Sequence, residues 1–311
     1  MRRTGLPLIT GATGFAGGHL VEHLTSQGTR VHAWGHRSAP AADGARVAWT
    51  AVDLLDAAAV RNAIAAARPS IVYHCAGIAD VHGAWHEPAR ALRVNVIGTH
   101  NLLEAVRGLE PSCRVLVTGS ALVYKPSPDQ IAEDHPLGPA TPYGVSKLAQ
   151  EMTAASSPVP ALLARPFNHA GPRQSPAYAT SAFAQQIAEI ESGRRAPVLR
   201  VGNLDARRDI TDVRDTVRAY HALGELGEPK RPYNVCSGRA YTMRMLLDIL
   251  LSLARVRVTV EVDPARLRPS DNPLIHGSHA RLTADTGWRP AIPIEQTLAD
   301  LLDHWRARSA S

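Results

Sequence analysis

The sequence is poor in cysteine and in aromatic side chains. Its 311 residues include only three cysteines, Cys75, Cys113 and Cys236, which lie far apart and form no Cys-x-x-Cys pair. Such a set argues against a disulfide framework and against a cysteine-based zinc site, and it fits a reducing compartment. Aromatic residues make up 5% of the chain, but hydrophobic residues make up 45%, so the chain can still bury a sizeable core.

Long apolar runs are also missing. A membrane-spanning helix needs about 20 consecutive apolar residues, whereas the most apolar stretch, Met245 to Ala254, is interrupted by Asp248 and Ser252. The start of the chain shows no uninterrupted apolar core of the kind that a signal peptide requires. We therefore expect a cytoplasmic protein that does not enter a membrane.

Charge is sparse and has no single block of one sign. Charged residues make up 20% of the chain, which is too few for a disordered protein. The 34 Lys and Arg residues exceed the 28 Asp and Glu residues, which gives a net charge of +6. Many arginines lie in the second half without forming a stripe, and this favours small anionic ligands over nucleic acid as partners.

What the first half does have is a regular alternation of short apolar runs with longer segments of helical periodicity. The pattern predicts strands at residues 6–10, 30–34, 46–50, 71–75, 114–118 and 161–164, and helices at 17–26, 57–67, 90–107 and 143–155. Strands alternating with helices are typical of a parallel sheet covered on both faces. We therefore expect an α/β fold built on a doubly wound parallel sheet.

The second half is less regular and richer in Pro, Gly and Arg. Helices are predicted at residues 180–192, 213–226, 242–253 and 294–307, joined by extended pieces at 198–201, 233–235 and 257–261. We therefore divide the chain into a first domain, residues 1–165, and a smaller C-terminal α/β region, residues 166–311. Some segments of the second region are expected to return to the first sheet.

Residues 11–17, Gly-Ala-Thr-Gly-Phe-Ala-Gly, join the first predicted strand to the first predicted helix. Glycines at this place make a tight turn, let the backbone approach a pyrophosphate, and let the next helix pack closely with its N-terminal amides toward the phosphates. The position after a strand and before a helix predicts a Rossmann-type dinucleotide site. The residues expected to contact the cofactor here are Gly11, Thr13, Gly14, Phe15, Ala16 and Gly17.

The end of the second predicted strand bears on which dinucleotide is bound. An NAD-binding protein usually carries Asp or Glu there to hold the ribose 2′-hydroxyl, but this sequence has Gly35, His36 and Arg37. No carboxylate repels a 2′-phosphate, and Arg37 can pair with one, so NADP(H) is favoured over NAD(H). Asp53 and Leu54, which follow the third predicted strand, are expected to face the adenine. Ala76 and Gly77, which follow the fourth, are expected to lie beside the phosphates.

Tyr143 and Lys147 form a second chemical feature. Four residues apart on a predicted helix, they share one face. A tyrosine has a reference pKa of about 10, and a neighbouring ammonium group lowers that pKa because it stabilises the phenolate. The pair can then act as a general acid or base, and both residues would also contact the cofactor. Ser120, just after the fifth predicted strand, is placed to orient a carbonyl group.

Together these residues resemble the extended short-chain dehydrogenase/reductase superfamily. The resemblance rests on the glycine pattern that begins at Thr10, on Ser120 and on the Tyr143/Lys147 pair, and further motifs extend it over nearly the whole chain to the nucleotide-sugar branch. These are residues 165–172 (RPFNHAGP), 201–205 (VGNLD), 208–215 (RDITDVRD), 233–238 (YNVCSG), 267–270 (LRPS), 277–282 (GSHARL) and 286–290 (TGWRP). The set is most similar to GDP-4-keto-6-deoxy-D-mannose reductases and more distantly to GDP-mannose 4,6-dehydratases.

The resemblance implies a role for each matching residue. Ser120, Tyr143 and Lys147 would be the catalytic set for hydride transfer between a nicotinamide cofactor and C4 of a GDP-linked 4-keto-6-deoxyhexose. Arginine forks and an orienting amide suit a diphosphate, and the residues expected to bind the sugar nucleotide are Asn168, Val201, Asn203, Arg208 and Arg268. The family also implies a homodimer formed by the helices at residues 90–107 and 143–155.

One departure from the family pattern concerns the residues after Ser120. Dehydratases of this superfamily carry an acidic residue there for loss of water, but this chain has Ala121, Leu122 and Val123, none of which can carry a proton. Dehydratase chemistry is therefore disfavoured. Three alternatives stay open: a reductase of another keto sugar, a nucleotide-sugar epimerase that retains its cofactor, and a non-catalytic nucleotide-binding protein on the same fold.

The fourteen histidines raise the question of a metal site. His19 and His23 share one helical face but have no intervening Glu, so we predict no metal. His82 and His169 are candidates for the substrate pocket. Asn95 has two readings, a hydrogen-bonding brace for the active-site strand or a catalytic group.

Overall fold

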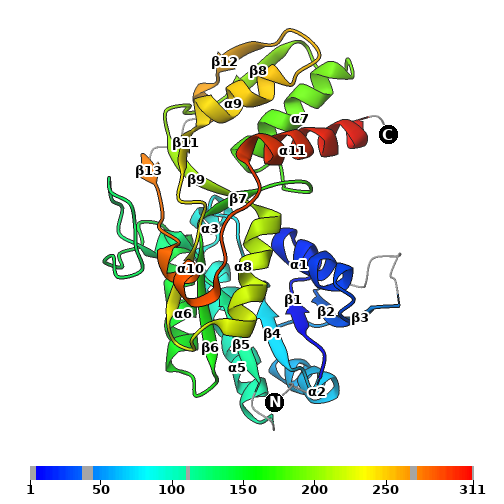
Figure 1. Ribbon diagram of the computed structural model, residues 1–311, viewed down its shortest axis with the longest axis vertical. Coiled ribbons are helices and arrows are strands. Elements are labelled where there is room, and N and C mark those ends of the chain that lie inside the picture. The colour runs from blue at the N-terminus through cyan, green and yellow to red at the C-terminus, as the bar shows by residue number, and fades with distance from the viewer. Residues whose placement is uncertain (1–4, 37–44, 110–112, 267–271, 310–311) are drawn as a thin grey trace.

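A computed structural model of the chain (Figure 1) describes residues 5–36, 45–109, 113–266 and 272–309. Its centre is a seven-stranded sheet in the order β10-β6-β5-β4-β1-β2-β3, and every neighbouring pair of strands is parallel. The strands are β1 (Leu8–Thr10), β2 (Val31–Gly35), β3 (Val47–Ala51), β4 (Ile71–His74), β5 (Arg114–Thr118), β6 (Ala161–Pro166) and β10 (Pro232–Val235).

Helices cover both faces of this sheet. Successive residues of a strand point to opposite faces, so the apolar side chains of each strand pack into two different cores. Ile9 packs in one core with α1 (Phe15–Ser26), α8 (Val213–Leu226) and α10 (Ala280–Thr286). Leu8 packs in a second core with α2 (Ala57–Ala67), α5 (Gly98–Arg107) and α6 (Pro142–Ser156). This confirms the predicted α/β fold with a doubly wound parallel sheet.

The remaining elements of the C-terminal half form a second region, at the upper end of Figure 1. Its core lies among α7 (Ala179–Glu191), α9 (Met243–Ser252) and α11 (Ile294–Ser309). Strand β9 (Arg207–Asp212) pairs with β7 (Asn168–Ala170), β11 (Ala240–Thr242) and β13 (Leu274–Ile275), while β8 (Val198–Val201) pairs with β12 (Thr259–Val262).

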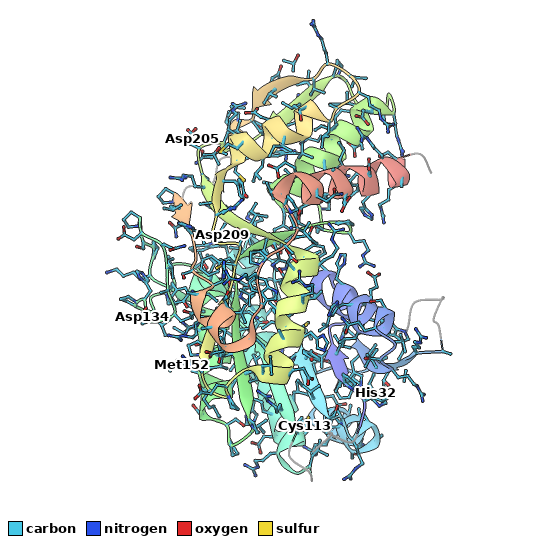
Figure 2. The ribbon with its side chains drawn as sticks, viewed as in Figure 1. His32, Cys113, Asp134, Met152, Asp205 and Asp209 are labelled. Atoms are coloured by element: carbon cyan, nitrogen blue, oxygen red, sulfur yellow. The ribbon has the colours of Figure 1, made fainter. Side chains whose placement is uncertain are left out.

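The two regions are interleaved along the chain. After the first crossing into the second region, α8, β10 and α10 return to the large sheet. Asp209, labelled in Figure 2, is fully buried and joins the regions: it accepts hydrogen bonds from the backbone N–H groups of Ser237 (2.8 Å) and Gly238 (3.0 Å), just after β10. The carboxyl end of β10 is thereby held against β9.

Helical periodicity predicted one helix over residues 90–107, but the structure differs there. The segment is divided into α4 (Pro88–Leu92), a π-helical turn over Arg93–Ile97, and α5. A π-turn inserts one extra residue into the helical ladder, and such turns are frequent at functional sites. The short helix α3 (Gly83–His86) precedes this segment.

Candidate functional site

The loop between β1 and α1 is closely packed. Gly11 has a φ of +66°, and a Cβ atom there would lie 2.6 Å from the backbone N of Ala76. A Cβ on Gly17 would lie 2.2 Å from the carbonyl oxygen of Gly11. Gly14 begins α1 without a side-chain cap, and the first turn holds no acidic residue. The loop therefore leaves the N-terminal amides of α1 to an anionic ligand.

The loop that follows β4 lies beside both the glycine loop and α6. Gly77 has a φ of +158°, and a Cβ there would be 2.7 Å from Oδ1 of Asn95 and 3.9 Å from Nζ of Lys147. Only glycine fits this position. The predicted residues Ala76 and Gly77 thus lie between Gly11 on one side and Lys147 on the other.

The start of α6 sets the positions of Tyr143 and Lys147. Thr141 accepts a hydrogen bond from Gly144 N at 3.0 Å and Pro142 occupies the first turn, which is the arrangement expected at a helix N-terminus. The helix buries Tyr143, which is 8% exposed, and Lys147, which is 4% exposed. The two side chains therefore lie on the inner face, as their spacing predicted.

Lys147 is a buried cation with two neutral acceptors. Its Nζ donates to the carbonyl oxygen of Thr118 at 2.6 Å and to Oε1 of Gln150 at 2.6 Å. An ammonium group has three N–H bonds, so within the described residues one remains for a ligand. Burial lowers the pKa of Lys147 to about 8 because removal from water disfavours the charged form.

Ser120 Oγ accepts a hydrogen bond from Leu122 N at 3.1 Å, and Ser120 also lies near enough to Tyr143 to affect its pKa. Burial raises the pKa of Tyr143 above its usual value near 10, and the neighbouring Ser120 hydroxyl offsets only part of this increase. The expectation that Lys147 lowers the pKa of Tyr143 is therefore wrong here: burial outweighs the other influences, Lys147 is not among the groups that shift this pKa, and Tyr143 is protonated at neutral pH. Within the described part of the chain no hydrogen bond joins Tyr143 directly to Lys147.

The surroundings of Tyr143 are apolar. Its side chain belongs to a cluster that includes Ile78, Val81 and Leu122. The neighbouring groups that shift its pKa are Ser120 and Tyr178, neither of them a carboxylate. Leu122, two residues after Ser120, packs in the same apolar cluster as the tyrosine.

Tyr178 is a residue that sequence reasoning missed. It immediately precedes α7, and its hydroxyl donates to the carbonyl oxygen of Ala79 at 3.1 Å. It therefore bridges the second region to the loop after β4, close to Tyr143. A single tyrosine before a helix carries no motif, so only the three-dimensional contact reveals it.

Asn95 lies on the π-helical turn and acts as a brace. Its Oδ1 accepts from Ile78 N at 2.8 Å, and its Nδ2 donates to Ser146 Oγ at 2.9 Å. These bonds connect the loop after β4 to α6. The contacts of Asn95 are therefore those of a hydrogen-bonding brace, one of the two roles considered for it.

The residues predicted at the adenine end lie at the carboxyl ends of adjacent strands. His36 follows β2 and is exposed; Arg37 lies outside the described residues. Asp53 follows β3, is exposed, and accepts from Leu55 N at 2.9 Å. The carbonyl oxygen of Leu54 accepts from Asn101 Nδ2 at 2.9 Å.

The residues predicted to bind the sugar nucleotide come from two sheets. Asn168 is exposed on β7, which pairs with β9, the strand that carries Arg208. Val201 ends β8 and is buried, while Asn203 is exposed and accepts from Asp205 N at 2.9 Å. Arg268 lies outside the described residues.

The histidines differ in their surroundings. His169 stacks on Phe15 of the glycine loop, with the ring centroids 5.6 Å apart and the planes at 6°. His82 and His86 are exposed, with their Nε2 atoms 3.4 Å apart. In the described ranges no three or more His, Cys, Asp or Glu side chains are grouped as a metal would require.

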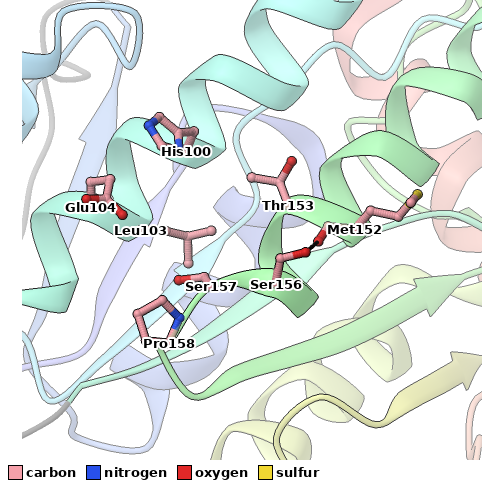
Figure 3. Close-up of a pocket in the computed structure, with 8 residues that line it drawn as sticks. All are labelled: His100, Leu103, Glu104, Met152, Thr153, Ser156, Ser157 and Pro158. Atoms are coloured by element: carbon pink, nitrogen blue, oxygen red, sulfur yellow. Dashed lines mark hydrogen bonds between the residues drawn. The ribbon is translucent and has the colours of Figure 1, made fainter.

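A hollow of about 450 Å³ lies on the outer side of α5 and α6. Figure 3 shows the residues that line it: His100, Leu103, Glu104, Met152, Thr153, Ser156, Ser157 and Pro158. The catalytic candidates are not among them. The hollow belongs to the helix face predicted to form a dimer.

No helix among the described residues has the length and apolar character needed to cross a membrane.

Comparison with known proteins agrees with this geometry. The profile of the GDP-mannose 4,6 dehydratase family matches residues 8–301. GDP-6-deoxy-D-mannose reductase of Pseudomonas aeruginosa is 36% identical over 307 residues, which cover 96% of this chain and 97% of that protein.

Two solved structures are similar throughout. The structure of RMD from Pseudomonas aeruginosa complexed with NADPH has a TM-score of 0.85 and 35% identity, covering 98% of this chain and 100% of that one. A putative epimerase from Burkholderia cenocepacia has a TM-score of 0.87 and 36% identity, covering 99% and 100%. The resemblance to the nucleotide-sugar branch of the extended short-chain dehydrogenase/reductases is therefore confirmed, and the chain belongs to the GDP-mannose 4,6 dehydratase family.

Proposed function

We propose that this protein is a reductase that uses NADPH to convert GDP-4-keto-6-deoxy-D-mannose into GDP-6-deoxy-D-mannose. The observation that carries the proposal is the protonated, buried Tyr143, which lies beside Ser120 and is surrounded by apolar side chains. A ketone reductase needs an acid at this place and no second acid–base group. The similarity to the Pseudomonas aeruginosa reductase supports the same reaction.

The residues present fit a nicotinamide dinucleotide. The loop of Gly11 and Gly17 leaves no room for side chains, the amides of α1 can hold a pyrophosphate, and Lys147 has an N–H left for a ribose hydroxyl. Such a cofactor supplies the hydride. The further residues that would hold it are Thr13, Gly14, Phe15, Ala16, His36, Arg37, Asp53, Leu54, Ala76, Gly77 and Tyr143.

NADP(H) is preferred over NAD(H) in this proposal. The support is the lack of a carboxylate in Gly35-His36-Arg37 at the end of β2 and the NADPH present in the similar Pseudomonas aeruginosa structure. Other structures of the same fold contain NAD, among them an epimerase from Thermus thermophilus. A comparison of NADPH with NADH as reductant tests the preference.

In the proposed mechanism Ser120 donates a hydrogen bond to the C4 carbonyl oxygen and stabilises its developing negative charge. Tyr143 then transfers its proton to that oxygen, so that the ketone gains one hydride at carbon and one proton at oxygen. Lys147 would hold the ribose with the N–H that its two described acceptors, Thr118 O and Gln150 Oε1, leave over. General acid catalysis of this kind contributes about 10²–10⁴-fold to the rate.

The substrate half of the proposal assigns residues 166–311 mainly to the sugar nucleotide and residues 1–165 to the cofactor. Arg208 and Arg268 would pair with the diphosphate, and Asn168, Val201 and Asn203 would line the same site. A homodimer through residues 90–107, which end in α5, and residues 143–155 of α6 belongs to the proposal as well. It is supported by Val145 and Met152, which are apolar side chains of α6 that are 46% and 61% exposed.

An epimerase remains the second candidate, favoured by the similar structure from Burkholderia cenocepacia. A reductase oxidises one NADPH for each product molecule, whereas an epimerase leaves the bulk cofactor unchanged. The test is the absorbance of NADPH on addition of GDP-4-keto-6-deoxy-D-mannose. Stoichiometric oxidation supports the reductase, and no oxidation with either NADPH or NADH overturns it.

A further inference from the structure

We propose that Gln150, Thr99 and His74 are positioning residues that form a buried relay behind Lys147 and tie it to Thr10 at the start of the glycine loop. The proposal rests on the catalytic role given to Lys147 above. The relay would set the position and the proton affinity of Lys147 from the side opposite the ligand.

The relay is continuous in space although its members are far apart in sequence. Lys147 Nζ donates to Gln150 Oε1 at 2.6 Å, and Gln150 Nε2 donates to Thr99 Oγ1 at 2.9 Å. Thr99 Oγ1 lies 2.8 Å from His74 Nε2, and His74 Nδ1 lies 2.8 Å from Thr10 Oγ1. The chain of bonds therefore runs from α6 through α5 and β4 to β1.

The direction of the first bonds follows from the chemistry of the groups. An ammonium group can only donate, so the Gln150 atom that faces Lys147 must be the oxygen and the other atom must be the nitrogen. Thr99 also bonds the carbonyl oxygen of Asn95 at 2.6 Å, which can only accept. The Thr99 hydroxyl proton is thus used there, and Thr99 accepts from Gln150.

The same reasoning fixes the tautomer of His74. Because the Thr99 proton goes to Asn95, Nε2 of His74 must donate to Thr99. Nδ1 of His74 then accepts from the Thr10 hydroxyl, whose oxygen in turn accepts from Ala76 N at 3.3 Å. Burial, with Lys147 adding to it, lowers the pKa of His74 to about 3, so the ring is neutral at physiological pH and its unprotonated Nδ1 is the acceptor.

Burial makes the relay sensitive to substitution. Gln150, Thr99 and His74 are fully buried, and Thr10 is 1% exposed. A buried polar group that loses its partner costs more than the bond contributed, because water cannot replace the partner. Gln150 must offer an acceptor to Lys147 and a donor to Thr99 at once. Among uncharged side chains of this length, only an amide does both.

The groups that face Lys147 from the neighbouring elements are few. Cys75 and His74 act on it from the end of β4, and Thr118 offers only its carbonyl oxygen from β5. Tyr143 lies one turn earlier on α6. Glu151 follows Gln150 but pairs with Arg165. Gln150 is therefore the side chain at which a charge can be introduced next to Lys147 with the least change of shape.

Two variants of Gln150 test the proposal by moving the proton affinity of Lys147 in opposite directions. Gln150→Glu is isosteric and places a carboxylate beside Lys147, so the alkaline limb of the pH profile of kcat/KM should move up by about 1–3 pH units. Gln150→Met removes an acceptor from a buried cation, so the limb should move down by about one unit. Gln186→Glu, a buried glutamine of α7 that bonds Arg200, should leave the limb unchanged.

The outcomes separate this proposal from the proposed function. If Lys147→Met keeps wild-type kcat/KM, the catalytic assignment fails. If Lys147→Met is inactive while both folded Gln150 variants keep the wild-type limb, or move it in the same direction, the relay fails alone. A loss of activity in Gln150→Glu with an unmoved limb also overturns it, since a merely structural role predicts that result. Thermal unfolding of each variant shows whether it is folded.

Discussion

Arg165 on β6 donates two hydrogen bonds to the carboxylate of Glu151 on α6, from Nε at 2.9 Å and from Nη2 at 2.6 Å. The two side chains are 4% and 10% exposed. Tyr143 and Lys147 lie on the same helix, so this ion pair fixes their distance from the sheet. The helix that carries the proposed catalytic pair is therefore anchored by charge as well as by packing.

Removing one partner of this pair should destabilise the protein strongly. Arg165→Met leaves a buried carboxylate without its cation, which costs about 3–5 kcal/mol in the free energy of unfolding. Chemical denaturation measures the change. The exposed pair of Arg107 and Glu104 is the control, since Arg107→Ala should cost no more than about 1 kcal/mol. Equal effects at both pairs would contradict the role given to Arg165.

Gly17 and Gly18 on α1 make a matched comparison for the cofactor loop. A Cβ on Gly17 would lie 2.2 Å from Gly11 O, whereas a Cβ on Gly18 would lie 3.4 Å from Ala12 O. Gly17→Ala should therefore displace the loop and weaken NADPH binding at least tenfold, a loss of about 1.4 kcal/mol. Gly18→Ala should bind as the wild type does. Fluorescence titration with NADPH measures both, and similar dissociation constants would show that the close approach does not matter.

His74 should make the protein less stable in acid. Its pKa is lowered to about 3 in the folded state by burial, against about 6.5 in the unfolded chain. Between these values the unfolded state binds one more proton, so stability falls by about 1.4 kcal/mol per pH unit as the pH drops below 6.5. Above pH 6.5 the group has no effect.

The contribution of His74 is isolated by His74→Gln, which keeps a donor toward Thr99 and cannot titrate. Other buried histidines act in the same direction, so the difference between the two proteins is the quantity to measure. Denaturation at pH 7 and pH 5 should show a wild-type loss that exceeds the loss in the variant by about 2 kcal/mol. Parallel losses would mean that His74 is protonated in the folded protein.

Tyr143→Phe should abolish most of the activity and leave the fold intact. The variant lacks the acid that protonates the alkoxide oxygen, so kcat should fall by about 10²–10⁴-fold. NADPH should still bind, because Phe keeps the ring of Tyr143 and only the contact made by its hydroxyl is lost. Wild-type turnover in this variant would exclude Tyr143 as the proton donor.

Local patterns predicted the large sheet and the helices that carry the site. The strands around residues 8–10, 31–35 and 71–74 and the helix from residue 142 lie where alternation and periodicity placed them. The positions of these elements depend on residues close together in the sequence. The strands of a parallel sheet that is buried on both faces appear as continuous apolar runs. The Tyr143 and Lys147 face followed from helical spacing alone.

Contacts between distant residues could not be predicted in this way. Gln150 and Thr99 are 51 residues apart, and Thr99 and His74 are 25 apart, so no local pattern joins them. The π-helical turn at Arg93–Ile97 was not predicted either, because its apolar periodicity differs from that of an α-helix by a single residue. Strands β7, β11 and β13 are set by pairing with β9 and carry too few residues for a pattern, whereas β8 and β12 lie close to extended pieces that the sequence predicted.

The most direct test of the account uses NADPH deuterated at the transferring position of the nicotinamide. With GDP-4-keto-6-deoxy-D-mannose as substrate, the proposed reaction places one deuterium on C4 of the sugar for each NADPH oxidised, and NMR of the purified product locates it. A product that carries no deuterium, formed while the NADPH in solution stays unchanged, would contradict the reductase and identify an enzyme that retains its cofactor.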